Sequence, residues 1–216
     1  MSQPAPPAGT GLRISPLTPD LLDDLGAVLK GSWGASCWCL YPRFTDRELR
    51  ELPGDGPART RRRAVMTRLA ARPLAPGLVA HDGDRPVGWV AVAPRPELGR
   101  IVRSRATPAV DGAAVWVIPC ITVTPPARGR GVAVALIGAA TAYARWAGAR
   151  IVEAYPRAEG ERGAQRPSDD SVYFGTEALF ARAGFSVARP PVPGLPANWQ
   201  PRVAMRLLLD GTGPLP

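Results

Sequence analysis

Residues 121–133 read ITVTPPARGRGVA, and this stretch decides the fold. It completes an apolar run, residues 115–123, that is typical of a strand buried on both faces. A glycine-containing turn follows from Arg128 to Gly131, and an apolar helix pattern begins at Val132. A turn of this kind aims successive backbone N–H groups and the positive end of the helix dipole at one point. The stretch therefore predicts a binding site for a phosphate-bearing ligand.

The composition of the turn favours close approach of phosphates. Gly129 and Gly131 have no Cβ in the way, and Arg128 and Arg130 add positive charge. The turn is neither a Walker loop, because no Gly-Lys-Ser/Thr follows, nor a dinucleotide fingerprint, because Gly-x-Gly-x-x-Gly is absent. Taken alone, it also fits a plain arginine-rich helix start.

Expected strands and helices alternate along the rest of the chain. The strands are expected at 12–14, 78–80, 87–93, 115–123, 151–155, 185–188 and 203–209, and the helices at 21–29, 58–71, 132–147 and 173–183. Thr18 is the expected N-cap of the first helix. Pro119 interrupts its strand and predicts a bulge or a splayed edge there. The class is α/β or α+β around one mixed sheet.

The composition is that of one ordinary globular domain. The chain has 216 residues, of which 45% are hydrophobic and 21% charged. We expect the domain to span residues 12–210, with tails at 1–11 and 211–216. No run of 18 apolar residues exists that could cross a membrane, and the N-terminus does not resemble a secretory signal. Three cysteines suit a reducing compartment, so the expected location is the cytoplasm.

The charge is strongly positive, with a net value of +9. A net positive charge of this size suggests nucleic acid as a possible binding partner. However, Lys30 is the only lysine among 27 basic residues, and Ala, Gly and Pro are abundant. This usage indicates the coding bias of a GC-rich genome, and no motif that interleaves basic and aromatic residues is present. We therefore expect no nucleic-acid partner and keep that function as a third hypothesis.

The turn matches a family signature at every specified position. Residues Arg128-Gly129-Arg130-Gly131-Val132-Ala133 fit the pattern Gln/Arg-x-x-Gly-x-Gly/Ala between a strand and a helix, and the chain thereby resembles the GNAT acetyltransferase superfamily. The following helix, strand 151–155 and segment 178–185 fall where that family places them, so the resemblance covers about residues 78–188. It implies a central mixed, mostly antiparallel sheet that is flanked by helices and contains a splayed pair of parallel strands.

The resemblance also implies acetyl-coenzyme A as co-substrate, without a metal. Main-chain groups of Ile121, Thr122 and Val123 would pair with the pantetheine arm. The backbone N–H of Ile121 would donate to the thioester carbonyl, and an acceptor amine would attack directly, with no acyl-enzyme intermediate. The pyrophosphate would lie on the backbone amides of Arg128, Gly129, Arg130, Gly131, Val132 and Ala133.

Two positions depart from the family pattern. Phe180 stands where many members carry a tyrosine that protonates the departing thiolate, although it could still pack against the cofactor. Tyr173 lies seven residues earlier, on the same face of the expected helix, and is the candidate acid and a cofactor contact, or else a packed tyrosine. Glu153, between apolar neighbours on its strand, is the candidate general base, or else the partner of an arginine.

Several other residues carry hypotheses about the acceptor. The aromatic stretch after the first helix would contribute an acceptor pocket, with core packing as the alternative. Cys37, Cys39 and Cys120 are too few ligands for zinc, and Cys120 is expected to be a small buried side chain. His81 is expected to be solvated in a polar turn, and the acidic segment 155–172 is expected to flank the acceptor or form surface. The acceptor-binding candidates are Trp33, Trp38, Tyr41 and Arg43.

The sequence favours an N-acetyltransferase that acts on a primary amine of a small metabolite. A protein or peptide amine is an alternative acceptor, because loops determine that choice. Another alternative is a degenerate domain that binds acyl-coenzyme A as a sensor without turnover, which Phe180 would support. We expect a monomer or a homodimer.

Overall fold

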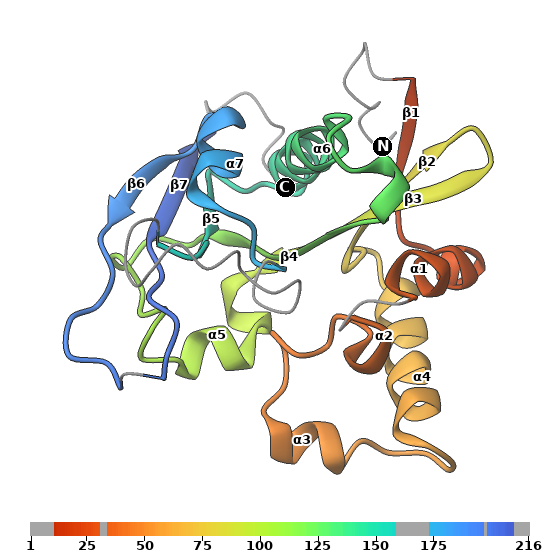
Figure 1. Ribbon diagram of the computed structural model, residues 1–216. Coiled ribbons are helices and arrows are strands. Elements are labelled where there is room, and N and C mark those ends of the chain that lie inside the picture. Colours follow the sequence, from red (N-terminus) through yellow and green to blue (C-terminus); the bar gives the residue numbers. More distant parts are fainter. Residues whose placement is uncertain (1–10, 31–33, 159–172, 197, 210–216) are drawn as a thin grey trace.

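The computed structural model describes residues 11–30, 34–158, 173–196 and 198–209, and its centre is one mixed sheet (Figure 1). The strand order is β1-β2-β3-β4-β5-β7-β6. The pairing of β4 with β5 is parallel, whereas the other paired strands are antiparallel. The predicted fold class is thus confirmed. The strands are β1 Leu12–Pro16, β2 Gly77–Asp82, β3 Arg85–Pro94, β4 Trp116–Val123, β5 Ile151–Ala154, β6 Ser186–Arg189 and β7 Ala204–Leu208.

Helices cover both faces of the sheet (Figure 1). The longest, α6, lies on one face together with α7, while α1, α2 and α4 pack on the other. Short 3₁₀ turns occur at Pro19–Leu21, Arg95–Glu97 and Pro125–Ala127. The α-helices are α1 Leu22–Leu29, α2 Gly34–Cys37, α3 Asp46–Arg50, α4 Ala58–Ala70, α5 Gly99–Arg103, α6 Val132–Trp146 and α7 Glu177–Arg182.

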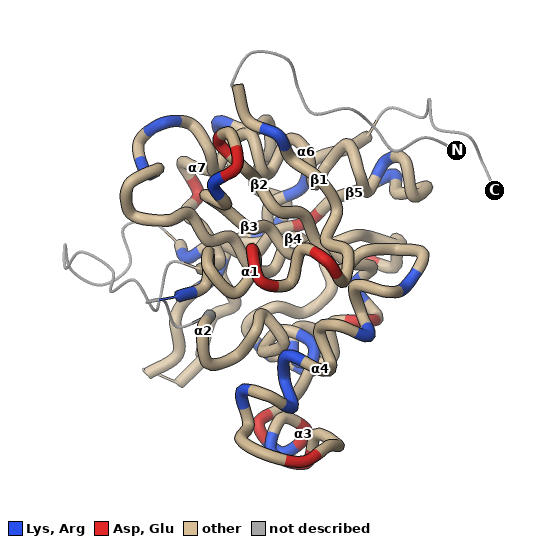
Figure 2. Tube along the Cα trace, turned by 90° about the vertical axis from the view of Figure 1, so that its right-hand side faces the viewer, with Lys and Arg blue, Asp and Glu red and all other residues tan. Residues whose placement is uncertain are grey.

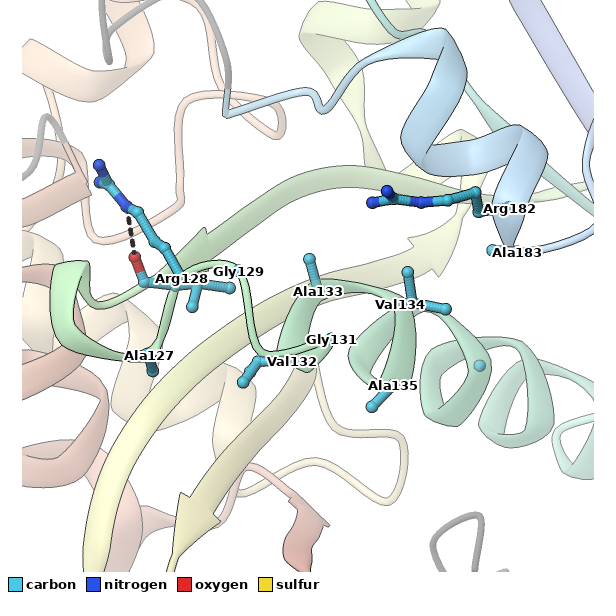
Figure 3. Close-up of a pocket in the computed structure, with 12 residues that line it drawn as sticks. Ala127, Arg128, Gly129, Gly131, Val132, Ala133, Val134, Ala135, Arg182 and Ala183 are labelled. Carbon is cyan, nitrogen blue, oxygen red and sulfur yellow. Dashed lines mark hydrogen bonds between the residues drawn. The ribbon is translucent and has the colours of Figure 1, made fainter. Parts of the chain in front are cut away.

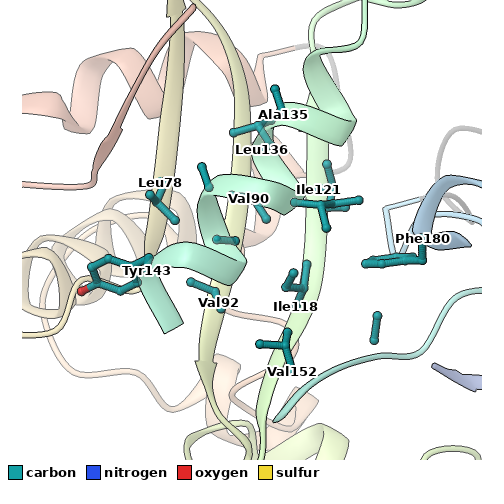
Figure 4. Packing of buried hydrophobic residues seen from close by; sticks show 14 of the residues in the cluster. Leu78, Val90, Val92, Ile118, Ile121, Ala135, Leu136, Tyr143, Val152 and Phe180 are labelled. Carbon is teal, nitrogen blue, oxygen red and sulfur yellow. The ribbon is translucent and has the colours of Figure 1, made fainter. Parts of the chain in front are cut away.

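The core under α6 explains why this helix sits firmly on the sheet. Its inner face is rich in alanine, which allows close approach, and Leu136 and Tyr143 are fully buried against the sheet (Figure 4). The Tyr143 hydroxyl accepts a hydrogen bond from the backbone N–H of Ala75 at 2.7 Å. The polar end of this buried ring is thereby satisfied, and the C-terminal part of α6 is joined to the segment before β2.

The parallel strands β4 and β5 separate after a short contact. They pair at Trp116 with Val152, at Val117 with Glu153 and at Ile118 with Ala154. The next residue, Pro119, has no N–H to donate, and β4 shifts register against β3 between Ala91 and Ala93. No further described pair joins the two strands. The splay that Pro119 predicted is therefore present, and it leaves one edge of β4 open beyond Ile118.

Three local predictions were wrong. The last helix begins at Glu177 rather than at Tyr173, because Gly175 adopts a φ of +76° and the Thr176 side chain caps the helix by accepting from the N–H of Leu179 at 3.2 Å. Tyr173 and Phe180 therefore do not share a helix face. Thr18 makes no side-chain cap hydrogen bond, since a 3₁₀ turn precedes α1.

The third error concerns His81. His81 lies in β2 rather than in the following turn, and the residue is 1% exposed. Nε2 lies 2.9 Å from a carboxylate oxygen of Asp24 in α1. The ring links a helix to the sheet and is not solvated.

Charged residues are spread over the molecule. Lys and Arg occur on many elements and are interspersed with Asp and Glu (Figure 2). Many arginines are committed to ion pairs, for example Arg63 with Asp23 at 2.6 Å and Arg130 with Asp82 at 2.9 Å. Residues 1–10 and 211–216 of the expected tails lie outside the described residues, as do Trp33 and most of the acidic segment 155–172.

Candidate active site

The first turn of α6 presents backbone donors that the helix itself does not use. Gly131 is the N-cap with a φ of +80°, and no side chain caps this end. The first i to i−4 bond runs from the N–H of Ala135 to the carbonyl of Gly131 at 3.0 Å. The N–H groups of residues 132–134 therefore have no acceptor within the helix, and no acidic residue stands in this turn. The arrangement fits an anion.

A pocket of about 1010 Å³ opens in front of this helix end (Figure 3). Small residues of the first two turns of α6 line it, including Ala133 and Gly138. Arg128 and Arg182 line it from the loop before α6 and from α7. Sequence reasoning did not assign Arg182, whose position depends on how α7 packs beside α6. Arg130, by contrast, does not line the pocket, because it pairs with Asp82.

The open edge of β4 adds main-chain groups beside the pocket. The N–H of Thr124 donates to the carbonyl of Val87 on β3 at 2.9 Å. Since backbone groups alternate along a strand, Thr122 also faces β3, whereas Ile121 and Val123 face the gap. The Val123 carbonyl accepts from Nε of Arg128 at 3.3 Å. Of the three predicted pantetheine contacts, Ile121 and Val123 are thus oriented for main-chain pairing, and Thr122 is not.

Tyr173 closes the gap from the other side. Its carbonyl accepts the N–H of Ile121 at 2.7 Å. Its ring meets the ring of Tyr41 edge to face, with centroids 6.3 Å apart, and stacks obliquely on Phe174 at 4.4 Å. Burial raises the pKa of the Tyr173 phenol, and the nearby Arg202 opposes this only in part. The hydroxyl therefore stays protonated at neutral pH.

Tyr173 also lines a second cavity, of about 560 Å³. Tyr41 and Trp199 contribute aromatic walls. Tyr41 and Tyr173 pack against the residues that cover the sheet face opposite α6. These two walls of the second cavity thus lie on the side of the sheet opposite α6, whereas the first cavity is lined by the start of α6. The arginines of the second cavity are Arg100, Arg103 and Arg202.

Two predicted acceptor residues lie elsewhere. Trp38 is buried among the side chains of α1 and α4 and has the guanidinium of Arg63 over its ring. Arg43 is also buried and donates to Glu97 at 2.8 Å. Tyr41 is thus the predicted acceptor residue that the structure places on the second cavity. Long-range partners such as Glu97 leave no trace in the local sequence around residue 43.

Glu153 is held in an ion pair. Its side chain is 1% exposed, accepts from Nε of Arg206 at 2.7 Å, and accepts from the Tyr155 hydroxyl. It appears among the described lining residues of neither cavity. This geometry favours the arginine-paired interpretation over the general base. Phe180 is fully buried against Phe185 and also lines neither cavity in the described part of the chain.

The cysteines form a buried cluster below β4. The sulfur atoms of Cys39 and Cys120 lie 3.3 Å apart, and Trp89 donates its indole N–H to Cys39 at 3.1 Å. A hydrogen bond with Cys120 and burial raise the pKa of Cys39 well above its usual value. Such thiols are inert packing groups. Within the described ranges, no group of three or more His, Cys, Asp and Glu side chains could hold a metal.

Comparison with known proteins agrees with this architecture. Residues 41–166 match the model of the Acetyltransferase (GNAT) family. The chain belongs to the GNAT acetyltransferase family. It is therefore an acyltransferase that uses acetyl-coenzyme A. A comparison with curated proteins gives no match.

Solved structures share the GNAT fold at low sequence identity. PaiA N-acetyltransferase from Thermoplasma acidophilum, in complex with coenzyme A, has 13% identity and a TM-score of 0.52 over 92% of this chain and 99% of that one. An acetyltransferase of the GNAT family from Streptococcus pneumoniae has 15% identity and a TM-score of 0.53 over 92% and 99%. YncA from Salmonella typhimurium, with acetyl-CoA, has 17% identity and a TM-score of 0.51 over 93% and 95%.

The residues present fit this co-substrate. Uncapped N–H groups, two glycines with open space before them and two arginines face one pocket, which suits the phosphates of coenzyme A. In the portion of the chain that the structure describes, no helix combines the length and apolarity that crossing a bilayer requires.

Proposed function

We propose that this GNAT enzyme transfers the acetyl group of acetyl-coenzyme A to a primary amine of a small metabolite by direct attack. The observation that carries the proposal is the second cavity. Its volume of about 560 Å³ falls in the range of small-molecule sites. Tyr173 forms its wall and is hydrogen-bonded to the open edge of β4.

Each donor-side residue has a distinct task in the proposal. The N–H groups of residues 132–134, which have no acceptor within the helix, bind the pyrophosphate at the positive end of α6. Arg128 and Arg182 supply charge to the phosphates. The main chain of Ile121 and Val123 orients the pantetheine arm along the open edge of β4. Acetyl-coenzyme A supplies the activated acyl group.

The proposed chemistry centres on Ile121 and Tyr173. The N–H of Ile121 donates to the thioester oxygen as negative charge develops there, and the Tyr173 carbonyl gives up that N–H when the donor binds. The amine nitrogen forms the new bond to the acyl carbon as the C–S bond breaks. The Tyr173 hydroxyl donates its proton to the departing sulfur, and a proton of the attacking nitrogen leaves to water or to Tyr173.

The acceptor enters as the free amine. The side chains described around the second cavity include no carboxylate and no imidazole, and Glu153 is engaged with Arg206. We therefore assign no side-chain base. The three cysteines carry free thiols, which suits a reducing compartment, and we propose a cytoplasmic location.

The deciding experiment combines binding with turnover. Thermal unfolding with and without acetyl-coenzyme A should show stabilisation, and thiol release with a panel of small amines should exceed the rate without amine. Efficient acetylation of peptides and of no small amine would contradict the small-metabolite assignment. Stabilisation without thiol release on any amine or peptide would favour a sensor, and no stabilisation would overturn the assignment of the pocket.

A further inference from the structure

The three arginines of the second cavity differ in whether their charge is neutralised. Arg100 donates to Asp46 at 2.8 Å, and Arg103 donates to Glu48 at 3.0 Å. Arg202 makes no ion pair with any carboxylate among the described residues; its hydrogen bond runs from Nη1 to the backbone carbonyl of Tyr155 at 3.1 Å. Among the described residues, the arginine of this cavity that has no carboxylate partner is therefore Arg202.

Burial makes the charge of Arg202 less favourable than it would be in water. Its guanidinium lies 3.7 Å from the ring centroid of Phe174, in a cation–π contact that also holds it in place. Burial lowers its pKa to about 10, although Tyr173 and Tyr41 oppose the change and Arg157 repels the charge further. A partly desolvated cation of this kind gains from an anion that fits beside it.

We propose that the acceptor amine carries a carboxylate and that Arg202 binds this carboxylate. The inference rests on the proposed function, because it names the substrate class of the same site. One uncompensated charge matches a singly charged anion, since the other two cationic side chains already have partners. With its carboxylate on Arg202, the ligand extends past Tyr41 toward Tyr173, whose carbonyl touches the β4 edge where the acyl group is expected. The acceptor is thus a small amino acid.

The test uses pairs of amines that differ only in charge. A series of amino acids and ω-amino acids of increasing length is compared with the corresponding carboxamides, with thiol release as readout. We expect kcat/KM to be about 10- to 100-fold higher for the best acid than for its amide, the range of a charge-assisted hydrogen bond. Arg202→Met should remove this preference by lowering the rate for the acid to that for the amide, and Arg202→Lys should restore part of it.

Controls separate this proposal from the function on which it rests. Arg68→Met removes one exposed positive charge from α4 and should leave the acid-to-amide ratio unchanged. Stabilisation by acetyl-coenzyme A should be the same in Arg202→Met and in the natural protein. If that stabilisation is absent in both, the proposed function fails. If it is present but acids and amides react equally, or both fall together in Arg202→Met, the carboxylate assignment fails.

A binding readout covers the case in which no amine of the series reacts. The same acids are then added to the protein with coenzyme A, and thermal unfolding is followed. Stabilisation by an acid, but not by its amide, that disappears in Arg202→Met would support the carboxylate site. Absence of any stabilisation that depends on Arg202 would overturn it.

Discussion

Single residues of the donor and acceptor sites owe their properties to where the backbone places them. Gly131 is useful because its positive φ turns the chain into α6 while leaving the first N–H groups of the helix uncapped. Tyr173 is useful because one residue supplies a carbonyl to Ile121 and a ring to the second cavity. The glycine could be assigned from its motif. The sequence also points to the tyrosine, but through an argument about a shared helix face that the turn at Gly175 invalidates.

Gly131→Asp should abolish stabilisation by acetyl-coenzyme A. The new carboxylate would stand at the helix end that is expected to bind pyrophosphate and would repel it. Open space surrounds Gly131, and its positive φ costs the new side chain about 1 kcal/mol, so the fold should persist with a small loss of stability. The measurement is thermal unfolding with and without the ligand. Gly148→Asp is the matched control, because Gly148 also has a positive φ and open space but follows the far end of α6. Equal ligand effects in both variants would disprove the assignment.

Tyr173→Phe should lower kcat by about 100-fold if the hydroxyl protonates the thiolate. The ring is retained, so the contacts with Tyr41 and Phe174 should survive. Burial raises the pKa of Tyr173 above its usual value of about 10. The hydroxyl therefore keeps its proton up to about pH 10, and over that range kcat of the natural enzyme should not fall because of its ionisation. Steady-state kinetics across pH checks both points. An unchanged kcat and pH profile would make Tyr173 a packing residue.

At the scale of elements, the sequence predicts strands and helices that have a regular hydrophobic period. It does not predict the turns and ion pairs that connect them. The buried run at 115–123 and the helix at 132–147 were predicted to within about one residue of β4 and α6, because each has a clear period and a clear stop. The start of α7 was missed, since a glycine turn breaks a pattern that looks continuous. The ion pairs of Arg43 with Glu97 and of Glu153 with Arg206 join distant segments, and local sequence carries no signal for them.

Gly175→Ala should destabilise the protein more than Gly83→Ala. Both glycines have a positive φ, which costs an alanine about 1 kcal/mol. A Cβ at Gly175 would also lie 2.8 Å from the buried Phe180 ring, whereas Gly83 has open space. We expect an additional loss of about 1–3 kcal/mol at Gly175. Urea unfolding of the two variants measures the difference in their free energies of unfolding. Equal decreases in the two variants would show that the Phe180 ring can move away from the new Cβ at little cost.

At the scale of the whole molecule, Arg206 joins the neighbouring strands β5 and β7 to the loop before β4. From β7 it pairs with Glu153 on β5 and with Asp111 in that loop, at 2.7 and 2.6 Å. Hydrogen bonds from Arg206 lower the pKa of Asp111 to about 2. The pKa is depressed in the folded state, so the stabilisation is present above the unfolded-state pKa of about 4 and is lost as the pH falls toward 2.

Asp111→Asn should therefore reduce the free energy of unfolding at neutral pH and flatten its dependence on pH between about 4 and 2. Urea unfolding at several pH values compares the variant with the natural protein. Asp55→Asn, at an exposed carboxylate without an ion pair in the described residues, is the control. A difference between Asp111→Asn and the natural protein that stays constant down to pH 2 would contradict the role of this ion pair.

The splay between β4 and β5 has a consequence for how the protein behaves in solution. A sheet that parts in its middle has unpaired backbone groups there as well as at its rim, and unpaired strand edges recruit other chains. The carbonyl of Tyr173 accepts a hydrogen bond from one such group, the N–H of Ile121. A bound pantetheine arm, whose amides can pair like those of a strand, would form hydrogen bonds with further unpaired backbone groups of β4. The enzyme should thus be most prone to self-association when it is empty, and its co-substrate should also keep it monodisperse.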